Sequence, residues 1–288
     1  MISTLRDLIA PLTEEEFLAI IRTRTLTLRR NVGENRFADL LKWDVLRGVI
    51  ESDNYPHESL RVFANTELVP PIFYRQQGKV SPERLTSLVR QGASFMANRV
   101  EDFVPALRAL CAHIAARLAE DVQFTAVMTA GRGGAVKRHY DHPDAAVFQL
   151  AGSKRWRIYG PAVAYPVRGM AKPPMPNGAP FFDEILHEGD FLYMPSGHWH
   201  DCENGPGHSL HLSLLIYPLS GFAALKSVLK RMSEEEIMRV PLARLESVED
   251  RIAGEAALKA RMIEAINSSS LLECRGGAAK TGYDDEPY

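Results

Sequence analysis

Two short segments of the chain carry residue types that bind metal ions. The first contains His139 and Asp141, separated by one residue, and the second, far along the sequence, contains His198 and His200. A His-x-Asp pair plus a distant histidine is the ligand set of the 2-His-1-carboxylate facial triad. That triad holds Fe(II) on one face and leaves the other face open for a co-substrate and oxygen. The pattern therefore points to oxygenase chemistry.

The spacing within each segment restricts how such a site could form. Because alternate residues of a strand share a face, a strand through His139 and Asp141 would direct both side chains at one ion, with Tyr140 opposite. The tripeptide alone is a weak signal, since a His-x-Asp match often arises by chance. In the second segment, spacing alone allows either His198 or His200 to be the distant ligand.

The composition indicates a soluble globular protein with a nearly balanced charge. The chain has 288 residues, of which 45% are hydrophobic and 24% charged, so it can bury a large core. A formal net charge of -2 gives no reason to expect nucleic acid or an anionic membrane as a partner.

The cysteines and the N-terminus suggest a cytoplasmic protein. Cys111, Cys202 and Cys274 are too few and too scattered for a disulfide framework or a Cys-rich zinc site, which fits a reducing compartment. The first residues include Arg6 and Asp7 and lack the order of a signal peptide. No apolar run approaches the roughly 18 residues that span a bilayer.

Periodicity changes twice along the chain. Residues 1–120 are predicted to be mostly helical, and their clearest amphipathic stripe consists of Val104, Leu107, Leu110, Ile114 and Leu118. Residues 121–218 contain short runs rich in β-branched and aromatic residues, separated by Gly, Pro and Asp, which is typical of an antiparallel barrel or jelly roll. Within them, the Pro- and Gly-rich stretch 161–180 is predicted to form a long loop across the barrel mouth.

Helical spacing returns after Pro218. Residues 219–268 are predicted to form a helical segment, and the polar residues 269–288 a disordered tail. Amphipathic helices in this position fit either a cap that packs on the barrel or a homodimer interface, and amphipathicity does not separate the two.

Two stretches resemble a known enzyme family. HYDHPDAAVFQLAGSKRWRIYGP, from His139 to Pro161, and GDFLYMPSGHWH, from Gly189 to His200, are similar to the JmjC and cupin-type Fe(II)/2-oxoglutarate oxygenases, and within these to the ribosomal protein hydroxylases. The matching positions are His139, Tyr140, Asp141, Asp144, Gln149, Gly152, Lys154, Arg155, Trp156, Arg157 and Tyr159. Ala145 and Ala146 stand where the family has Val and Phe.

The resemblance implies a fold and a set of ligands. The fold is a double-stranded β-helix (jelly-roll or cupin barrel), flanked by N-terminal helices and a C-terminal helical segment. The metal is Fe(II), the co-substrates are 2-oxoglutarate and O2, and the ligands are His139, Asp141 and His200, since the family's second histidine is the fifth residue after Pro195.

The resemblance also implies a co-substrate site. Lys154 occupies the position that pairs with the C5 carboxylate of 2-oxoglutarate, where a dianion inside a barrel needs a cation. Ser213 aligns with a residue that assists this cation, and His211 lies nearby on the same polar face. By itself, the alternation of Ser209, His211 and Ser213 with leucines fits a half-exposed strand equally well.

The chain departs from the family in two further places. Val127 stands near a position where many relatives have a co-substrate-binding Tyr, and Thr125 and Thr129 are the candidates to replace it. The C-terminal region is shorter than the winged-helix domain of the larger relatives, which leaves the substrate open.

Three functions are compatible with these residues. The first is hydroxylation of a protein or peptide side chain, with release of succinate and CO2. The second is hydroxylation of a small molecule, such as an amino acid or natural product, on the same scaffold. The third is a non-oxygenase metal-binding cupin, a class that often carries a third His and a Glu instead of a cation at the position of Lys154.

Overall fold

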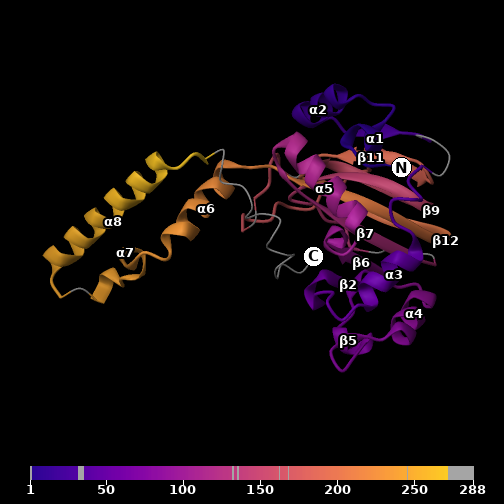
Figure 1. Ribbon diagram of the computed structural model, residues 1–288, viewed down its shortest axis with the longest axis horizontal. Coiled ribbons are helices and arrows are strands. Elements are labelled where there is room, and N and C mark those ends of the chain that lie inside the picture. Colours follow the sequence, from indigo (N-terminus) through magenta and orange to yellow (C-terminus); the bar gives the residue numbers. More distant parts are fainter. Residues whose placement is uncertain are drawn as a thin grey trace. The chain divides into compact units, whose positions relative to one another are not determined.

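The computed structural model describes residues 2–31, 36–131, 133–134, 136–161, 163–167, 169–244 and 246–271 (Figure 1). The chain divides into two compact units, of which one contains Met1–Pro218 and the other is Leu219–Thr281. Cys274 and most of the predicted disordered tail, residues 272–288, lie outside the described residues.

The larger unit is built on a ten-stranded antiparallel sheet. The strand order is β1-β11-β9-β12-β7-β6-β2-β3, while β10 pairs with β9 and β8 with β12. The strands are β1 (Thr27–Arg29), β2 (Leu60–Ala64), β3 (Glu67–Leu68), β6 (Ser94–Asn98), β7 (Asp121–Ala130), β8 (Gly133–Gly134), β9 (Asp144–Pro161), β10 (Phe182–His187), β11 (Phe191–Met194) and β12 (His198–Tyr217). A separate hairpin joins β4 (Arg75–Gln76) and β5 (Lys79–Val80).

The long strands β9 and β12 fold the sheet over on itself. The first half of β9 pairs with β11 and with the end of β12, whereas its second half pairs with β10 and with the start of β12. At the change of direction Gly152 has φ +65°, and a Cβ there would lie 1.9 Å from the carbonyl oxygen of His208, so only glycine fits. The predicted antiparallel jelly-roll core is thereby confirmed.

Both faces of the folded sheet are buried. Along β9, Ala146, Phe148 and Leu150 belong to a core shared with the N-terminal helices. Ala145 and Val147 belong to a second core, inside the barrel. Because strand residues alternate between faces and both faces are buried here, the first half of β9 contains the apolar run Ala145–Phe148.

Five α-helices accompany the sheet: α1 (Leu5–Ile9), α2 (Glu14–Thr23), α3 (Trp43–Glu51), α4 (Pro82–Arg90) and α5 (Pro105–Leu118). Short 3-10 helices occupy His57–Ser59, Pro71–Phe73 and Val100–Asp102. The predicted amphipathic helix is confirmed as α5, which buries Leu107, Leu110 and Ile114. Figure 1 shows α1 and α2 beside β11, and α3 and α4 at the end of the sheet formed by β6 and β2.

Residues 1–120 also contribute strands, which helical periodicity did not reveal. β6 pairs with β7 on one side and with β2 on the other, over five and four residue pairs. Strands this short carry too few alternations to be recognised, and they form because their backbone groups extend an existing ladder.

The smaller unit is helical. It contains α6 (Gly221–Met232), α7 (Glu236–Arg239), a 3-10 helix at Leu242–Arg244 and α8 (Val248–Ser268). Its small core consists of Ala224, Val228, Met232 and Ala265. Of the helices in the described part of the chain, none is long and apolar enough to cross a membrane.

Candidate metal centre and co-substrate pocket

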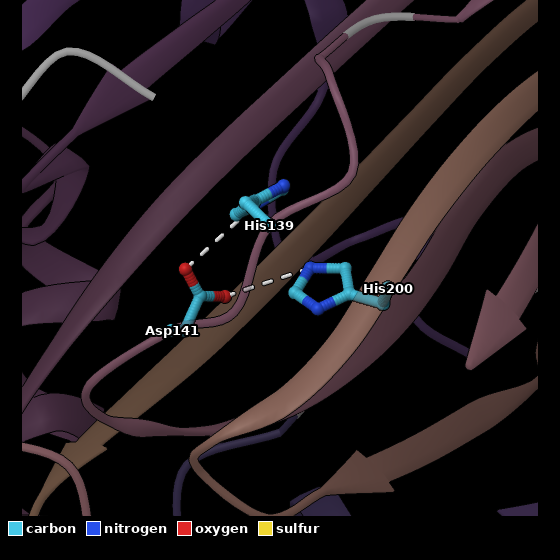
Figure 2. Close-up of side chains that lie close together, drawn as sticks. All are labelled: His139, Asp141 and His200. Carbon is cyan, nitrogen blue, oxygen red and sulfur yellow. Dashed lines mark ion pairs between the residues drawn. The ribbon is translucent and has the colours of Figure 1, made fainter. Parts of the chain in front are cut away.

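Three potential ligands converge at one end of the barrel (Figure 2). His139 and Asp141 come from the segment between β8 and β9, and His200 comes from β12. Asp141 lies between the two rings, with its Oδ1 3.7 Å from His139 Nε2 and its Oδ2 3.7 Å from His200 Nε2. One ligand atom from each residue lies within 4.8 Å of the others, the arrangement needed to share a single ion.

Backbone carbonyls orient both rings. His139 Nδ1 lies 2.8 Å from the carbonyl oxygen of Lys137, and His200 Nδ1 lies 3.0 Å from that of His198. A carbonyl can only accept, so in each ring Nδ1 carries a hydrogen and Nε2 is the nitrogen directed toward Asp141. Burial and the neighbouring His139 lower the pKa of His200 to about 4, which keeps this imidazole neutral.

The prediction that a strand carries His139 and Asp141 is wrong. Only His139 pairs, through an isolated antiparallel bridge to His200, and β9 begins later, at Asp144. The intervening Pro143 has no N–H to donate to a neighbouring strand, so it interrupts a ladder between Asp141 and the start of β9 at Asp144.

Backbone hydrogen bonds produce the convergence instead. The His139 N–H donates to the carbonyl of His200 (3.0 Å), and the His200 N–H donates to that of His139 (2.7 Å). The Gly197 N–H donates to the carbonyl of Asp141 (2.9 Å). The loop that bears two ligands is thus fastened directly to the strand that bears the third.

Of the two candidate histidines in the second segment, His200 joins the group and His198 does not. His198 Nδ1 lies 2.8 Å from the carbonyl oxygen of Pro195, and its ring packs near Phe181. Regular alternation would place both histidines on one face of β12, but the pairing of β12 with β9 shifts register between them. Of the two, His200 lines the cavity beside the triad.

A small cavity of about 70 Å³ adjoins the triad. Lys154, the predicted co-substrate cation, lines it and is only 2% exposed. Its Nζ donates to Thr129 Oγ1 (3.1 Å), and within the described part of the chain no carboxylate forms an ion pair with it. Burial lowers the pKa of Lys154. Because an uncompensated buried charge is costly, the cavity is suited to an anion.

Further unpaired polar atoms surround this cation. His211 Nδ1 and Trp156 Nε1 are both buried and have no hydrogen-bond partner among the described residues. Both residues line the cavity, as does Ser213. Burial holds the pKa of His211 well below its usual range. Buried polar groups are normally satisfied, so these atoms fit a ligand with acceptor oxygens.

Trp156 is a candidate site residue that matches the family's pattern, although no role in the site was predicted for it from the sequence. Its ring stacks on His200 (centroids 5.8 Å apart, 25° between planes) and meets His211 edge-on at 5.6 Å. The signal was available, because Trp156 lies two residues after Lys154 on β9 and therefore points into the same interior.

The two threonines considered beside Val127 take different positions. Thr129 Oγ1 accepts from Lys154 and from Ser94 Oγ (3.0 Å), so it holds the ammonium. Thr125 lines the cavity and donates to Asn98 Oδ1 (3.0 Å). Val127 lies between them and contributes an apolar wall.

The residue types fit the groups that the sequence suggested. Two imidazoles and a carboxylate, arranged on one side of a cavity, are a donor set suited to Fe(II). A buried ammonium with unpaired donors beside it suits a dicarboxylic acid.

Comparisons with known proteins agree with this chemistry. Residues 103–220 match the JmjC domain family. Over 145 residues, or 48% of this chain, it is 33% identical to the bifunctional lysine-specific demethylase and histidyl-hydroxylase NO66 of Drosophila mojavensis, covering 16% of that protein. Over 224 residues, or 73% of this chain, it is 28% identical to ribosomal oxygenase 1 of Bos taurus, covering 32% of that protein.

The chain spans only about a third or less of these relatives. Among solved structures it resembles the Escherichia coli ribosomal oxygenase YcfD in complex with cobalt and 2-oxoglutarate, with a TM-score of 0.61 and 17% identity, covering 91% of this chain and 69% of that one. At this identity the likeness establishes the fold. Taken together, the matched segment, the folded sheet and the relatives show that residues 103–220 match the JmjC domain family, that the fold is a cupin-like barrel, and that the chain is similar to the ribosomal oxygenases.

Proposed function

We propose that the protein is an Fe(II)- and 2-oxoglutarate-dependent dioxygenase that hydroxylates a side chain of a protein or peptide and releases succinate and CO2. One observation carries the proposal: the cavity beside the His139, Asp141 and His200 group also contains Lys154, a buried cation with no ion-pair partner among the described residues. A structural metal site would have no use for that cation.

In this proposal His139 and His200 hold iron through Nε2, and Asp141 holds it through its carboxylate. When bound, the iron supplies the activation of O2 that is coupled to oxidative decarboxylation of 2-oxoglutarate. The chain's own groups orient the ligands. The carbonyls of Lys137 and His198 fix the imidazoles, and such partners are as important to a metal site as its ligands.

Lys154 binds the C5 carboxylate of 2-oxoglutarate, positioned by Thr129. Ser213 and the donors of His211 and Trp156 surround the same acid. Apolar side chains such as Leu215 and Met194 line the remaining wall and exclude water from the reacting end. A protein of the same fold was solved with cobalt and 2-oxoglutarate bound, which supports this assignment.

The names of the relatives favour a protein substrate over a small molecule. These names include histidyl-hydroxylase and ribosomal oxygenase, and both describe enzymes that act on proteins.

Incubation with Fe(II), ascorbate, 2-oxoglutarate and ribosomal proteins tests the activity. We expect succinate release that depends on the protein substrate, and a substrate mass increased by one oxygen. Loss of a methyl group instead would indicate the demethylase activity that the first relative's name also includes. Full turnover by His139→Ala would contradict the assignment of the ligands.

We also propose that the protein acts in the cytoplasm without nucleic-acid or membrane contacts.

We further propose that the protein forms a homodimer through the helical unit. This unit exposes several large apolar side chains, namely Phe222, Leu225, Leu229, Ile252 and Ile263. Light scattering should give twice the mass of 32.1 kDa, and Phe222→Glu with Ile252→Glu should return it to the monomer value.

A further inference from the structure

We propose that Asp201 is a positioning residue that holds the two ligand-bearing segments in register, acting mainly through Arg138. Its effect on metal binding rests on the proposed function. Its effect on the register of the two segments does not, because that register exists in the protein without metal.

Asp201 and Arg138 are sequence neighbours of two ligands. Arg138 directly precedes His139, and Asp201 directly follows His200. Their side chains form an ion pair, with Nε 3.0 Å from Oδ2, and are 26% and 15% exposed. Because alternate strand residues face opposite sides, Asp201 points away from the cavity that His200 lines. It therefore acts on the ligands without touching them or the co-substrate.

Two further donors fix the Asp201 carboxylate. Arg157 Nε lies 2.7 Å from Oδ1, and the Tyr159 hydroxyl donates to Oδ2 at 2.9 Å. Both come from β9, so one carboxylate joins the His139 loop, β9 and β12. Arg138 is held as well, since its guanidinium stacks 3.5 Å from the centroid of the Tyr159 ring and donates to the carbonyl of Pro176 (3.2 Å).

The network reinforces a short connection. Among the described residues, the His139 segment is joined to the His200 segment by the isolated His139–His200 bridge and by one hydrogen bond from the Gly197 N–H to the carbonyl of Asp141. A metal site tolerates displacements of only about 0.5 Å, so these few backbone bonds require support from side chains. Three charge-assisted contacts directly beside the bridge provide that support. Outer partners of metal ligands typically contribute about 10–100-fold in metal affinity.

Cobalt(II) binding tests the inference. We expect Asp201→Asn to bind Co(II) about 10–100-fold more weakly than wild type and to alter the Co(II) absorption spectrum, which reports ligand geometry. The control is Asp183→Asn, which removes a bidentate ion pair with Arg155 (2.6 and 2.7 Å) on the same sheet. Adding Arg138→Ala to Asp201→Asn should cause little further loss, because the two residues act as one unit.

Amide hydrogen exchange in the metal-free protein provides the second readout. The N–H groups of His139 and His200 each donate to the other residue's carbonyl. Both amide hydrogens should exchange faster in Asp201→Asn than in wild type, and at the wild-type rate in Asp183→Asn. Equal exchange and equal Co(II) affinity in wild type and Asp201→Asn would overturn the inference, as would an equal loss in the control. If wild type failed to bind Co(II), the proposed function would fail, while the exchange rates would still decide the role of Asp201.

Discussion

Replacement of the buried Lys154 should have opposite effects on protein stability and on binding of 2-oxoglutarate. In Lys154→Met, a side chain of similar length loses its charge in a position that is 2% exposed. The mutation removes a hydrogen bond to Thr129, worth roughly 0.5–1.5 kcal/mol, and also a desolvated ammonium that has no anion beside it among the described residues. We expect the free energy of unfolding of the ligand-free protein to stay equal or to rise by about 1 kcal/mol.

Binding of 2-oxoglutarate should change in the opposite direction. Removing one partner of a buried charge pair costs roughly 2–5 kcal/mol, which corresponds to about 30-fold to several-thousand-fold weaker binding. Calorimetry on the Co(II)-loaded protein measures this loss, and urea unfolding measures stability. Lys137→Met is the matched control, because Lys137 is exposed and pairs with Glu67 outside the cavity.

A ligand comparison assigns the loss to the far carboxylate. 2-Oxopentanoate has the same chain length as 2-oxoglutarate and lacks the C5 carboxylate. Wild type should prefer 2-oxoglutarate strongly, and Lys154→Met should bind the two acids almost equally. Binding of 2-oxoglutarate by Lys154→Met within threefold of wild type would refute the reasoning, as would a loss of several kcal/mol in stability.

Three further sets of substitutions probe separate parts of the molecule. His200→Ala should lose at least about 100-fold in Co(II) affinity, whereas His198→Ala should lose little, as calorimetry can show. Burial raises the pKa of Glu101 to about 7, so folding favours its protonated form. The contribution of Glu101 to stability should therefore fall by about 3 kcal/mol as the pH rises from 4.5 to above 7, and urea unfolding of Glu101→Gln should show a flatter pH profile than wild type. Gly197→Ala should lower the melting temperature and Co(II) affinity, because its φ is +78° and a Cβ would lie 2.0 Å from a backbone oxygen, whereas Gly178→Ala has open space and should change neither.

Much of the fold could be predicted because it depends on local patterns. The stripe that became α5 and the runs that became β9, β11 and β12 carry their periodicity in the sequence. The short strands β2 and β6 could not be recognised, since their pairing partner β7 and its neighbours decide their conformation.

The candidate site was predictable in identity and less so in geometry. The resemblance pointed to His200 over His198 as the distant ligand, and His200 is the one that lies beside His139 and Asp141. The prediction of a strand through His139 and Asp141 was wrong, because Pro143 interrupts it. The contact of Lys154 with Thr129 and that of Arg138 with Asp201 join residues far apart in the sequence. Such contacts follow from how β9 and β12 fold over, which no local pattern encodes.

The proposed function requires that the triad and Lys154 form one iron and 2-oxoglutarate site. Visible absorption of the anaerobic Fe(II)-loaded protein during titration with 2-oxoglutarate tests this requirement, because chelation of Fe(II) by the keto acid produces a charge-transfer band. We expect a band that saturates near one equivalent in wild type, requires much more 2-oxoglutarate in Lys154→Met and is absent in His200→Ala. Wild-type protein that binds Fe(II) but develops no band at saturating 2-oxoglutarate would rule out the shared site.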